Sequence, residues 1–143
     1  MIQEIDGIEE RIRASFERQA LMALIGARLM SVDRGAVDIE LTFRNDLTQQ
    51  HGYLHAGVIT SILDSACGYA ALTTMPEGSD VVSVEFKVNL VRPAKGVAFV
   101  AEGRVLKAGR TLTVVRGDAY ADSAQGRVLV STMLATMMRV EPR

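Results

Sequence analysis

The spacing of apolar residues along the chain divides it into helical and strand-like regions. Residues 8–24 place apolar side chains at four-residue steps with charged residues between them, which predicts an amphipathic helix that Gly26 ends. Residues 28–44 alternate apolar and polar positions around the turn DRGA, which predicts a β-hairpin. The polar segment 45–54 is predicted to be a loop.

A second helix follows, and its apolar residues cover most of its circumference: Leu54, Val58, Ile59, Ile62, Leu63, Ala66, Ala70 and Ala71. Such a distribution is typical of a fully buried helix, which residues 75–78 should end. One acid, Asp64, lies among these side chains. A buried carboxylate costs several kcal/mol unless it is paired, hydrogen-bonded or used in chemistry. Asp64 is therefore the first candidate for function, with a structural acid paired inside the core as the alternative.

Four segments rich in β-branched residues occupy the chain from residue 81 onward, separated by the turns PAKG, AGR and SAQG. Ten-residue strands are ~33 Å long, enough to wrap around the buried helix. We therefore expect an α+β fold in which a hairpin and a four-strand meander form one curved antiparallel sheet, with one long central helix on its concave face. No repeat or second domain is indicated, so residues 1–143 form a single predicted domain.

Charge and cysteine content narrow the classes of function. A net charge of −1 gives no electrostatic footprint for nucleic acid or an anionic membrane. The single Cys67 excludes an internal disulfide and a multi-cysteine metal site. Acids and bases are intermixed in the first 25 residues, unlike in a signal or transit peptide, and no apolar run is long enough for a membrane span. We expect a cytoplasmic protein.

The segment before the buried helix carries the strongest motif. Gln49 is followed six residues later by His55, and Asp64 lies nine residues after that histidine. This spacing resembles the signature of hotdog-fold acyl-CoA thioesterases of the phenylacetate-degradation (PaaI-type) family, in which Gln or Asn precedes His-Gly-Gly and an acid lies at the helix centre. SVEFKVNLVRPAKG and VLKAGRTLTV are similar to later segments of that family. The chain departs from it at Ala56, where the family usually has glycine.

The resemblance implies hydrolysis of an acyl-CoA to a carboxylic acid and CoA, with no metal and no organic cofactor. Asp64 is then the general base for water, or the nucleophile that forms a mixed anhydride. Gln49 orients the water or the substrate carbonyl, Ser83 assists Asp64, and the residue after the histidine, Ala56, contacts the thioester oxygen. The family positions near the CoA phosphates and pantetheine are Arg92, Gly109, Arg110 and Thr111.

The helix geometry adds two expectations. Its N-terminus, at His55, Ala56 and Gly57, should offer unpaired N–H groups and the positive end of the helix dipole to a thioester oxyanion. Asp64 lies eight residues after Ala56, so the two are about 12 Å apart along the helix and too far apart to share one carbonyl. Two chains with antiparallel helices would bring Asp64 of one to the 55–57 turn of the other. We expect a homodimer with composite sites, which the family often stacks into homotetramers.

Several residues have a structural as well as a functional interpretation. His55 either hydrogen-bonds within its turn or acts as an acid or base, and His51 with His55 could form a metal pair, for which no third ligand is apparent. Cys67 fits core packing better than a nucleophile. Tyr53 and Tyr69 either line an acyl tunnel or pack. Three methionines are either core or a flexible wall for an acyl chain: Met133, Met137 and Met138.

Two other functions fit the same fold. An enoyl-acyl hydratase would use a histidine base in a strand–loop motif that is not found in this sequence. A non-catalytic acyl-CoA-binding protein would need neither Gln49 nor Asp64, and sensors of this kind usually carry a fused DNA-binding segment. The N-terminal helix is too short and too mixed in charge for a helix-turn-helix. Hydrolysis is the favoured prediction, and the sequence leaves the acyl group open.

Overall fold

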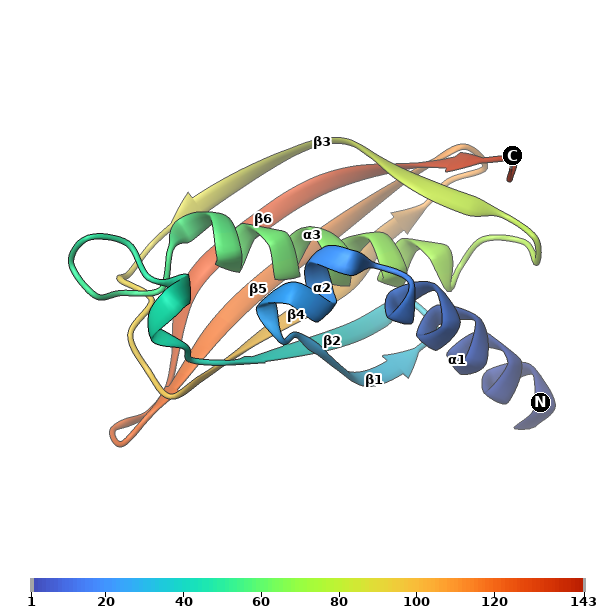
Figure 1. Ribbon diagram of the computed structural model, residues 1–143. Helices are drawn as coiled ribbons and strands as arrows, with labels where there is room; N and C mark the ends of the chain where they lie inside the picture. The colour runs from blue at the N-terminus through green and yellow to red at the C-terminus, as the bar shows by residue number, and fades with distance from the viewer. Residues whose placement is uncertain (1, 143) are drawn as a thin grey trace.

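The computed structural model describes residues 2–142, which form a six-stranded sheet, one long helix and two N-terminal helices (Figure 1). Helices α1 (Ile2–Glu17) and α2 (Ala20–Ile25) precede the hairpin β1 (Arg28–Asp33) and β2 (Ala36–Thr42). A 3-10 helix, η1 (Asn45–Leu47), leads to the central helix α3 (Ala56–Leu72). Four strands follow: β3 (Asp80–Leu90), β4 (Ala98–Ala108), β5 (Leu112–Ser123) and β6 (Gly126–Val140).

The N-terminal helix predicted over residues 8–24 is two helices. Between α1 and α2, Gln19 adopts an extended conformation, with φ −82° and ψ 99°. Gly26 ends α2 as predicted, in the left-handed conformation at φ 78°, which glycine adopts without a steric penalty. Within residues 2–142, no helix is long and apolar enough to cross a membrane.

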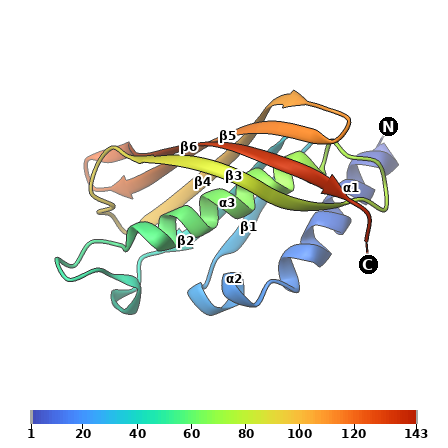
Figure 2. The same ribbon diagram turned by 90° about the horizontal axis from the view of Figure 1, so that it is seen from above.

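The sheet is antiparallel throughout, in the order β1-β2-β4-β5-β6-β3, and it curves around α3 (Figures 1 and 2). The predicted four-strand meander is therefore wrong for β3, which pairs with the last strand, β6, and not with β4. The physical reason is the connection: the seven residues 91–97 between β3 and β4 exceed an ordinary hairpin loop. They carry the chain across to β2, where β4 joins the N-terminal hairpin to the sheet.

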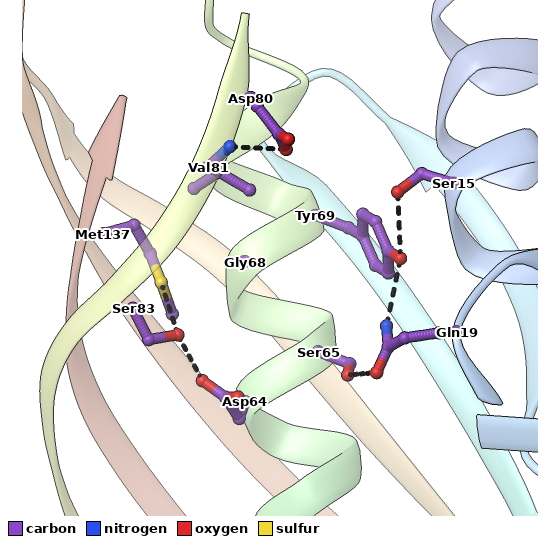
Figure 3. Close-up of a pocket in the computed structure, with 10 residues that line it drawn as sticks. All are labelled: Ser15, Gln19, Asp64, Ser65, Gly68, Tyr69, Asp80, Val81, Ser83 and Met137. Atoms are coloured by element: carbon purple, nitrogen blue, oxygen red, sulfur yellow. Dashed lines mark hydrogen bonds between the residues drawn. The ribbon is translucent and has the colours of Figure 1, made fainter. Parts of the chain in front are cut away.

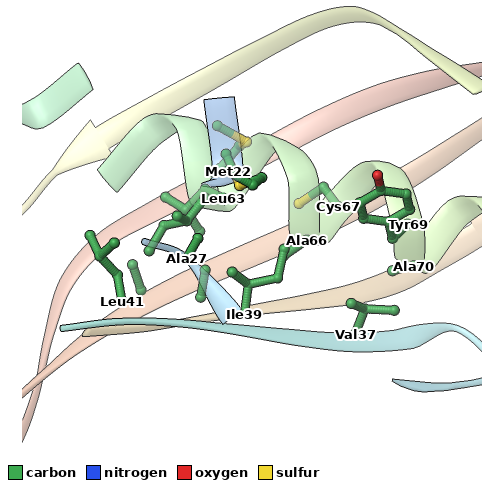
Figure 4. Packing of buried hydrophobic residues seen from close by; sticks show 14 of the residues in the cluster. Met22, Ala27, Val37, Ile39, Leu41, Leu63, Ala66, Cys67, Tyr69 and Ala70 are labelled. Atoms are coloured by element: carbon green, nitrogen blue, oxygen red, sulfur yellow. The ribbon is translucent and has the colours of Figure 1, made fainter. Parts of the chain in front are cut away.

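Two glycines let α3 approach the middle of the sheet closely. Gly103 on β4 and Gly117 on β5 are directly paired, and they lie beneath the turn of α3 at Ala66 and Cys67. A Cβ added at Gly103 would be 2.4 Å from the Ala66 carbonyl oxygen, and one at Gly117 would be 2.7 Å from Cys67 Sγ. On the neighbouring strand β2, alternate apolar residues, among them Ile39, complete the layer under the helix (Figure 4).

Helix α3 is buried on most sides but not on all of them, which corrects the expectation of full burial. Ile59, Ile62 and Leu63 are almost inaccessible to solvent, whereas Asp64 and Gly68 are half-buried and Gly57 is exposed. The sheet covers one side of the helix, as Figure 2 shows. Side chains of α1 contact one flank of it, since Phe16 lies beside the Tyr69 ring and Ser15 Oγ lies 3.2 Å from Tyr69 Oη. The side that remains carries small or polar residues, so Asp64 lies at an accessible surface and not inside the core.

Strand β3 is an edge strand whose residues are almost all exposed. Val82, Val84 and Phe86 keep 44%, 52% and 41% of their surface in contact with solvent. A long apolar edge offers unpaired backbone groups and side chains to another strand, and proteins that work as monomers generally protect such edges. This edge borders the accessible face of α3 (Figure 2).

Candidate active site

The centre of the candidate site is a hydrogen bond between helix α3 and strand β3. Ser83 Oγ donates to Asp64 Oδ1 at 2.6 Å. The pairing of β3 with β6 positions this serine, since Ser83 lies opposite Met137 and a bulge follows it in the strand. Met137 Sδ lies 3.3 Å from the same hydroxyl, whose one hydrogen is directed to the carboxylate as the stronger acceptor. Asp64 is thus a partly exposed, hydrogen-bonded acid.

A cavity of about 220 Å³ opens beside this pair (Figure 3). Its lining combines the Asp64–Ser83 pair with residues of α1, α3 and β3: Ser15, Gln19, Ser65, Gly68, Tyr69, Asp80, Val81 and Met137. In Figure 3, Asp64 and Ser83 lie on one side of α3, and Ser15, Gln19 and Tyr69 on the other, with Gly68 between the two groups. The carboxylate therefore faces a space that a small group can enter.

His55 caps the N-terminus of α3. Its Nδ1 accepts a hydrogen bond of 2.8 Å from the Gly57 N–H, and its own N–H donates to the Leu47 carbonyl oxygen. With Nδ1 as acceptor, a neutral imidazole carries its proton on Nε2. This geometry is the structural alternative considered for His55. Two of the three N–H groups expected to be unpaired at residues 55–57 are therefore engaged, and only that of Ala56 has no partner among the described residues.

Ala56 and Gln49 line a second, larger cavity of about 460 Å³. Gln49 Oε1 accepts hydrogen bonds from the N–H groups of His51 and Tyr53, which fixes the amide and leaves its NH₂ group as the donor. Arg92 borders the same cavity, where its Nη1 donates to the Leu129 carbonyl oxygen at 2.8 Å. Tyr53 also lines this cavity, with 36% of its surface exposed.

Within one chain, the two cavities lie at different ends of strand β6. Ser83 is opposite Met137, whereas Leu90, which lines the second cavity, is opposite Ser131. Six strand residues correspond to roughly 20 Å. The structure therefore brings Asp64 together with Ser83, and Gln49 with Ala56, but it does not bring these two pairs together.

The residues expected to contact CoA are divided in the same way. Arg92 lies at the Gln49 cavity, whereas Gly109, Arg110 and Thr111 form the exposed turn between β4 and β5. That turn is next to the far end of β6, because the Arg139 N–H donates to the Thr111 carbonyl oxygen. Close packing within the turn also explains why residue 109 is glycine, since an added Cβ would clash with the Leu112 carbonyl oxygen.

Cys67 lies one turn from Asp64 but has the properties of a core residue. It is fully buried, and burial is the main cause that raises the pKa of its thiol to about 12, with the negative charges of Asp64 and Asp118 as further causes. The thiol is therefore protonated and inert at neutral pH. Met133 and Met137 are also buried core residues, and Met137 in addition borders the Asp64 cavity.

A polar cluster beside Asp64 is not predicted by the sequence. Tyr69 is buried, and its hydroxyl contacts Ser15 Oγ at 3.2 Å and Gln19 Nε2 at 3.0 Å, while Ser65 Oγ donates to Gln19 Oε1 at 3.1 Å. The available signal was that Ser15 and Gln19 are uncharged polar residues four positions apart. Their long-range partner, Tyr69, could not be inferred from that spacing. Among the described residues, no group of three or more His, Cys, Asp or Glu side chains is arranged to hold a metal ion.

A six-stranded antiparallel sheet curved around one long central helix defines the hotdog fold. Residues 51–127 match the model of the thioesterase superfamily, and the chain belongs to this superfamily of thioester hydrolases. The crystal structure of a thioesterase family protein from Silicibacter pomeroyi is similar, with 44% identity and a TM-score of 0.92 over 94% of this chain and 99% of that one. The PaaI protein of the Escherichia coli phenylacetic acid degradation operon shares the fold at 20% identity, with a TM-score of 0.84 over 95% of each chain.

Two proteins from other organisms are also similar over most of the chain. A protein of Saccharolobus solfataricus, provisionally named as an esterase, is 30% identical over 80% of this chain and 79% of its own length. The human protein named acyl-coenzyme A thioesterase 13 is 28% identical over 90% of this chain and 92% of its own. The predicted hotdog fold and the resemblance to PaaI-type thioesterases are confirmed.

Proposed function

We propose that this protein hydrolyses acyl-CoA thioesters to a carboxylic acid and CoA, at sites built from two copies of the chain. The observation that carries this proposal is the Asp64–Ser83 hydrogen bond at the edge of a cavity, in a chain that belongs to the thioesterase superfamily. The name of the human relative supports CoA as the thiol of the substrate.

Asp64 supplies the attacking group. As a general base, it takes a proton from water while the water oxygen bonds to the thioester carbon. As a nucleophile, its oxygen forms the new bond, the C–S bond breaks, and water then hydrolyses the mixed anhydride. In both cases the CoA sulfur leaves and gains a proton. Ser83 holds one carboxylate oxygen at 2.6 Å and so orients the other toward the substrate.

The electrophile is activated at the N-terminus of α3. The Ala56 N–H, which has no partner among the described residues, donates to the thioester oxygen at the positive end of the helix dipole. His55 and Gly57 contribute through the cap that sets the direction of this first turn. The Gln49 amide, fixed through its oxygen by two backbone N–H groups, offers its NH₂ group to the carbonyl or to the water.

Asp64 and Ala56 act on the same carbonyl only if they come from different chains, since a single chain places them about 12 Å apart on one helix. Antiparallel pairing of β3 with β3 of a second copy would cover the exposed Val84 and Phe86 and place the accessible faces of both α3 helices together. The same pairing would place Arg92, which follows β3, of one chain near the Arg110 turn of the other, which lies next to the far end of β6, so that both could contact one CoA. Stacking of two dimers into a homotetramer is part of this proposal.

Release of free thiol from a panel of short, medium, long and aromatic acyl-CoAs tests the proposal. We expect turnover of at least one class, with the activity eluting as a dimer or a larger assembly. Binding of CoA esters without thiol release would favour a non-catalytic acyl-CoA-binding protein instead.

A further inference from the structure

The cavity at Asp64 has a second polar wall, which the hydrolysis described above does not use. Ser15 of α1 and Gln19, which precedes α2, form this distal wall with Ser65 and Tyr69 of α3 (Figure 3). The segment that matches the superfamily begins at residue 51, so Ser15 and Gln19 come from a part of the chain outside it.

Hydrogen bonds join the four side chains of the distal wall into one network, and this network does not use all of its donor hydrogens. Ser65 Oγ donates to Gln19 Oε1, and Gln19 Nε2 donates to Tyr69 Oη. Tyr69 Oη and Ser15 Oγ are 3.2 Å apart, and either one is the donor. One of these two hydroxyl hydrogens is therefore unused, and Gln19 Nε2 has a second hydrogen as well. The wall can donate to an oxygen atom of a ligand.

Gly68 keeps the path from Asp64 to this wall open. It lies in the interior of α3, one turn after Asp64, where glycine is less favourable than alanine. A Cβ added there would meet nothing within 4 Å, in contrast to those at Gly103 and Gly117. Packing within the chain therefore gives no reason for glycine at this position. Space for a ligand gives one.

The size and charge of the cavity restrict that ligand. At about 220 Å³, this cavity has less than half the volume of the cavity at Gln49 and Ala56, about 460 Å³, which favours a short acyl group. The described lining includes two acids, Asp64 and Asp80, and no Lys or Arg. A second carboxylate on the acyl group would be repelled, whereas a hydroxyl or carbonyl oxygen would not.

We infer that the acyl group lies along Gly68 with its far end at the distal wall, and that the enzyme prefers short acyl groups that end in an uncharged oxygen. This inference rests on the proposed function. An acyl chain that ends in a methyl group displaces water from the wall and leaves its donors unpaired. Sites built to hydrogen-bond a substrate hydroxyl reject the analogue that lacks it.

Three substrates of equal chain length test this preference: hexanoyl-CoA, 6-hydroxyhexanoyl-CoA and adipyl-CoA. We expect kcat/KM for the hydroxy substrate to exceed that for hexanoyl-CoA by at least ~10-fold, with adipyl-CoA the poorest. Equal values, or a preference for hexanoyl-CoA, would overturn the inference and leave the proposed function intact. No thiol release from any acyl-CoA would overturn both.

Two variants separate the wall from general stability. In the double variant Ser15→Ala and Tyr69→Phe, we expect the ratio of kcat/KM between the hydroxy substrate and hexanoyl-CoA to fall to near 1. The main cause should be a lower kcat/KM for the hydroxy substrate. Ser31→Ala, whose hydroxyl bonds Asp38 on the surface, is the control and should leave the ratio unchanged.

Gly68→Ala should raise the unfolding midpoint and lower kcat/KM for the hydroxy substrate more than for acetyl-CoA, with the oligomeric state unchanged. An equal effect on the two substrates, or none, would contradict the placement of the acyl group along Gly68.

Discussion

Ser83 donates its single hydroxyl hydrogen to Asp64 Oδ1, which leaves Oδ2 for the chemistry of the cavity. In Asp64→Asn, an amide oxygen still accepts from Ser83, so we expect an unchanged fold. Hydrolysis should fall by at least ~10²-fold, the usual scale for removal of a general base. Steady-state thiol release measures this. The matched control is Asp46→Asn, an exposed acid paired with Arg44. Turnover within about threefold of wild type would exclude both roles of Asp64.

Ala56 stands where the family usually has glycine, and its backbone explains why alanine is accepted. No non-glycine residue among those described has a positive φ, so the position imposes no need for glycine. Ala56→Gly should be nearly neutral. Ala56→Pro should keep the fold, since Ala56 is the first residue of α3, its N–H has no partner among the described residues, and His55 before it is extended at ψ 136°.

Proline nevertheless removes the proposed oxyanion donor at Ala56. We expect Ala56→Pro to lose about 10² to 10³ in kcat, the scale for loss of one such donor. Circular dichroism and size-exclusion chromatography check that the variant is folded and assembled. A folded, assembled Ala56→Pro enzyme with wild-type kcat would show that another group polarises the carbonyl.

Among the elements, α3 and the two strands beneath it fit together through the Gly103–Gly117 pair. Gly103→Ala forces its Cβ against the Ala66 backbone, whereas Gly117→Ala meets the side chains of Cys67 and Leu63. We expect both to destabilise by ~1–3 kcal/mol, with Gly103→Ala at the upper end because backbone cannot rotate away. Denaturant unfolding at one fixed protein concentration measures this. Cys67→Ala should partly rescue Gly117→Ala and leave Gly103→Ala unimproved; rescue of both would mean that the helix simply shifts.

Among the elements, local sequence patterns predicted where helices and strands form better than they predicted which strands pair. The 28–44 hairpin, the helix after residue 54 and the four late strands follow from period and turn residues that lie close together in sequence. The place of β3 in the sheet does not follow from such local patterns. It pairs with β6, and nothing in residues 80–90 indicates pairing with a strand some fifty residues later. The exposure of Asp64 was missed for a related reason, since small residues on a helix indicate burial and a partner surface equally well.

The candidate site likewise combines local features, which the sequence predicted, with long-range contacts, which it did not. The spacing from Gln49 through His55 to Asp64 is a local property and could be recognised, and the structure places each of them as a polar group at a cavity or a helix cap. The distal wall depends on Ser15 and Gln19 meeting Tyr69 about fifty positions away. Such a contact requires the tertiary fold.

At the scale of the whole molecule, one chain keeps the half-sites at Asp64 and Ala56 apart on α3, which predicts complementation between two inactive variants. Asp64→Asn and Ala56→Pro, each inactive alone, are mixed, unfolded and refolded together. Random pairing makes half of the dimers mixed, and each mixed dimer has one intact site, so about a quarter of wild-type activity should return. Differently tagged chains quantify the mixed dimers, and Asp64→Asn refolded with itself is the control. Mixed dimers without activity would place both groups within one chain.

The pairing of β3 with β6 also sets when the enzyme becomes competent during its synthesis. A ribosome produces the chain from the N-terminus at ~5–20 residues per second, so β1, β2, α3 and β4 can begin to associate while β3 still has no neighbouring strand. Ser83 reaches Asp64 only after Met137, opposite it on the last strand, has been made. The nascent chain therefore carries its acid and its helix before β6 exists, and the half-site at Asp64 is complete only once β6 has been made.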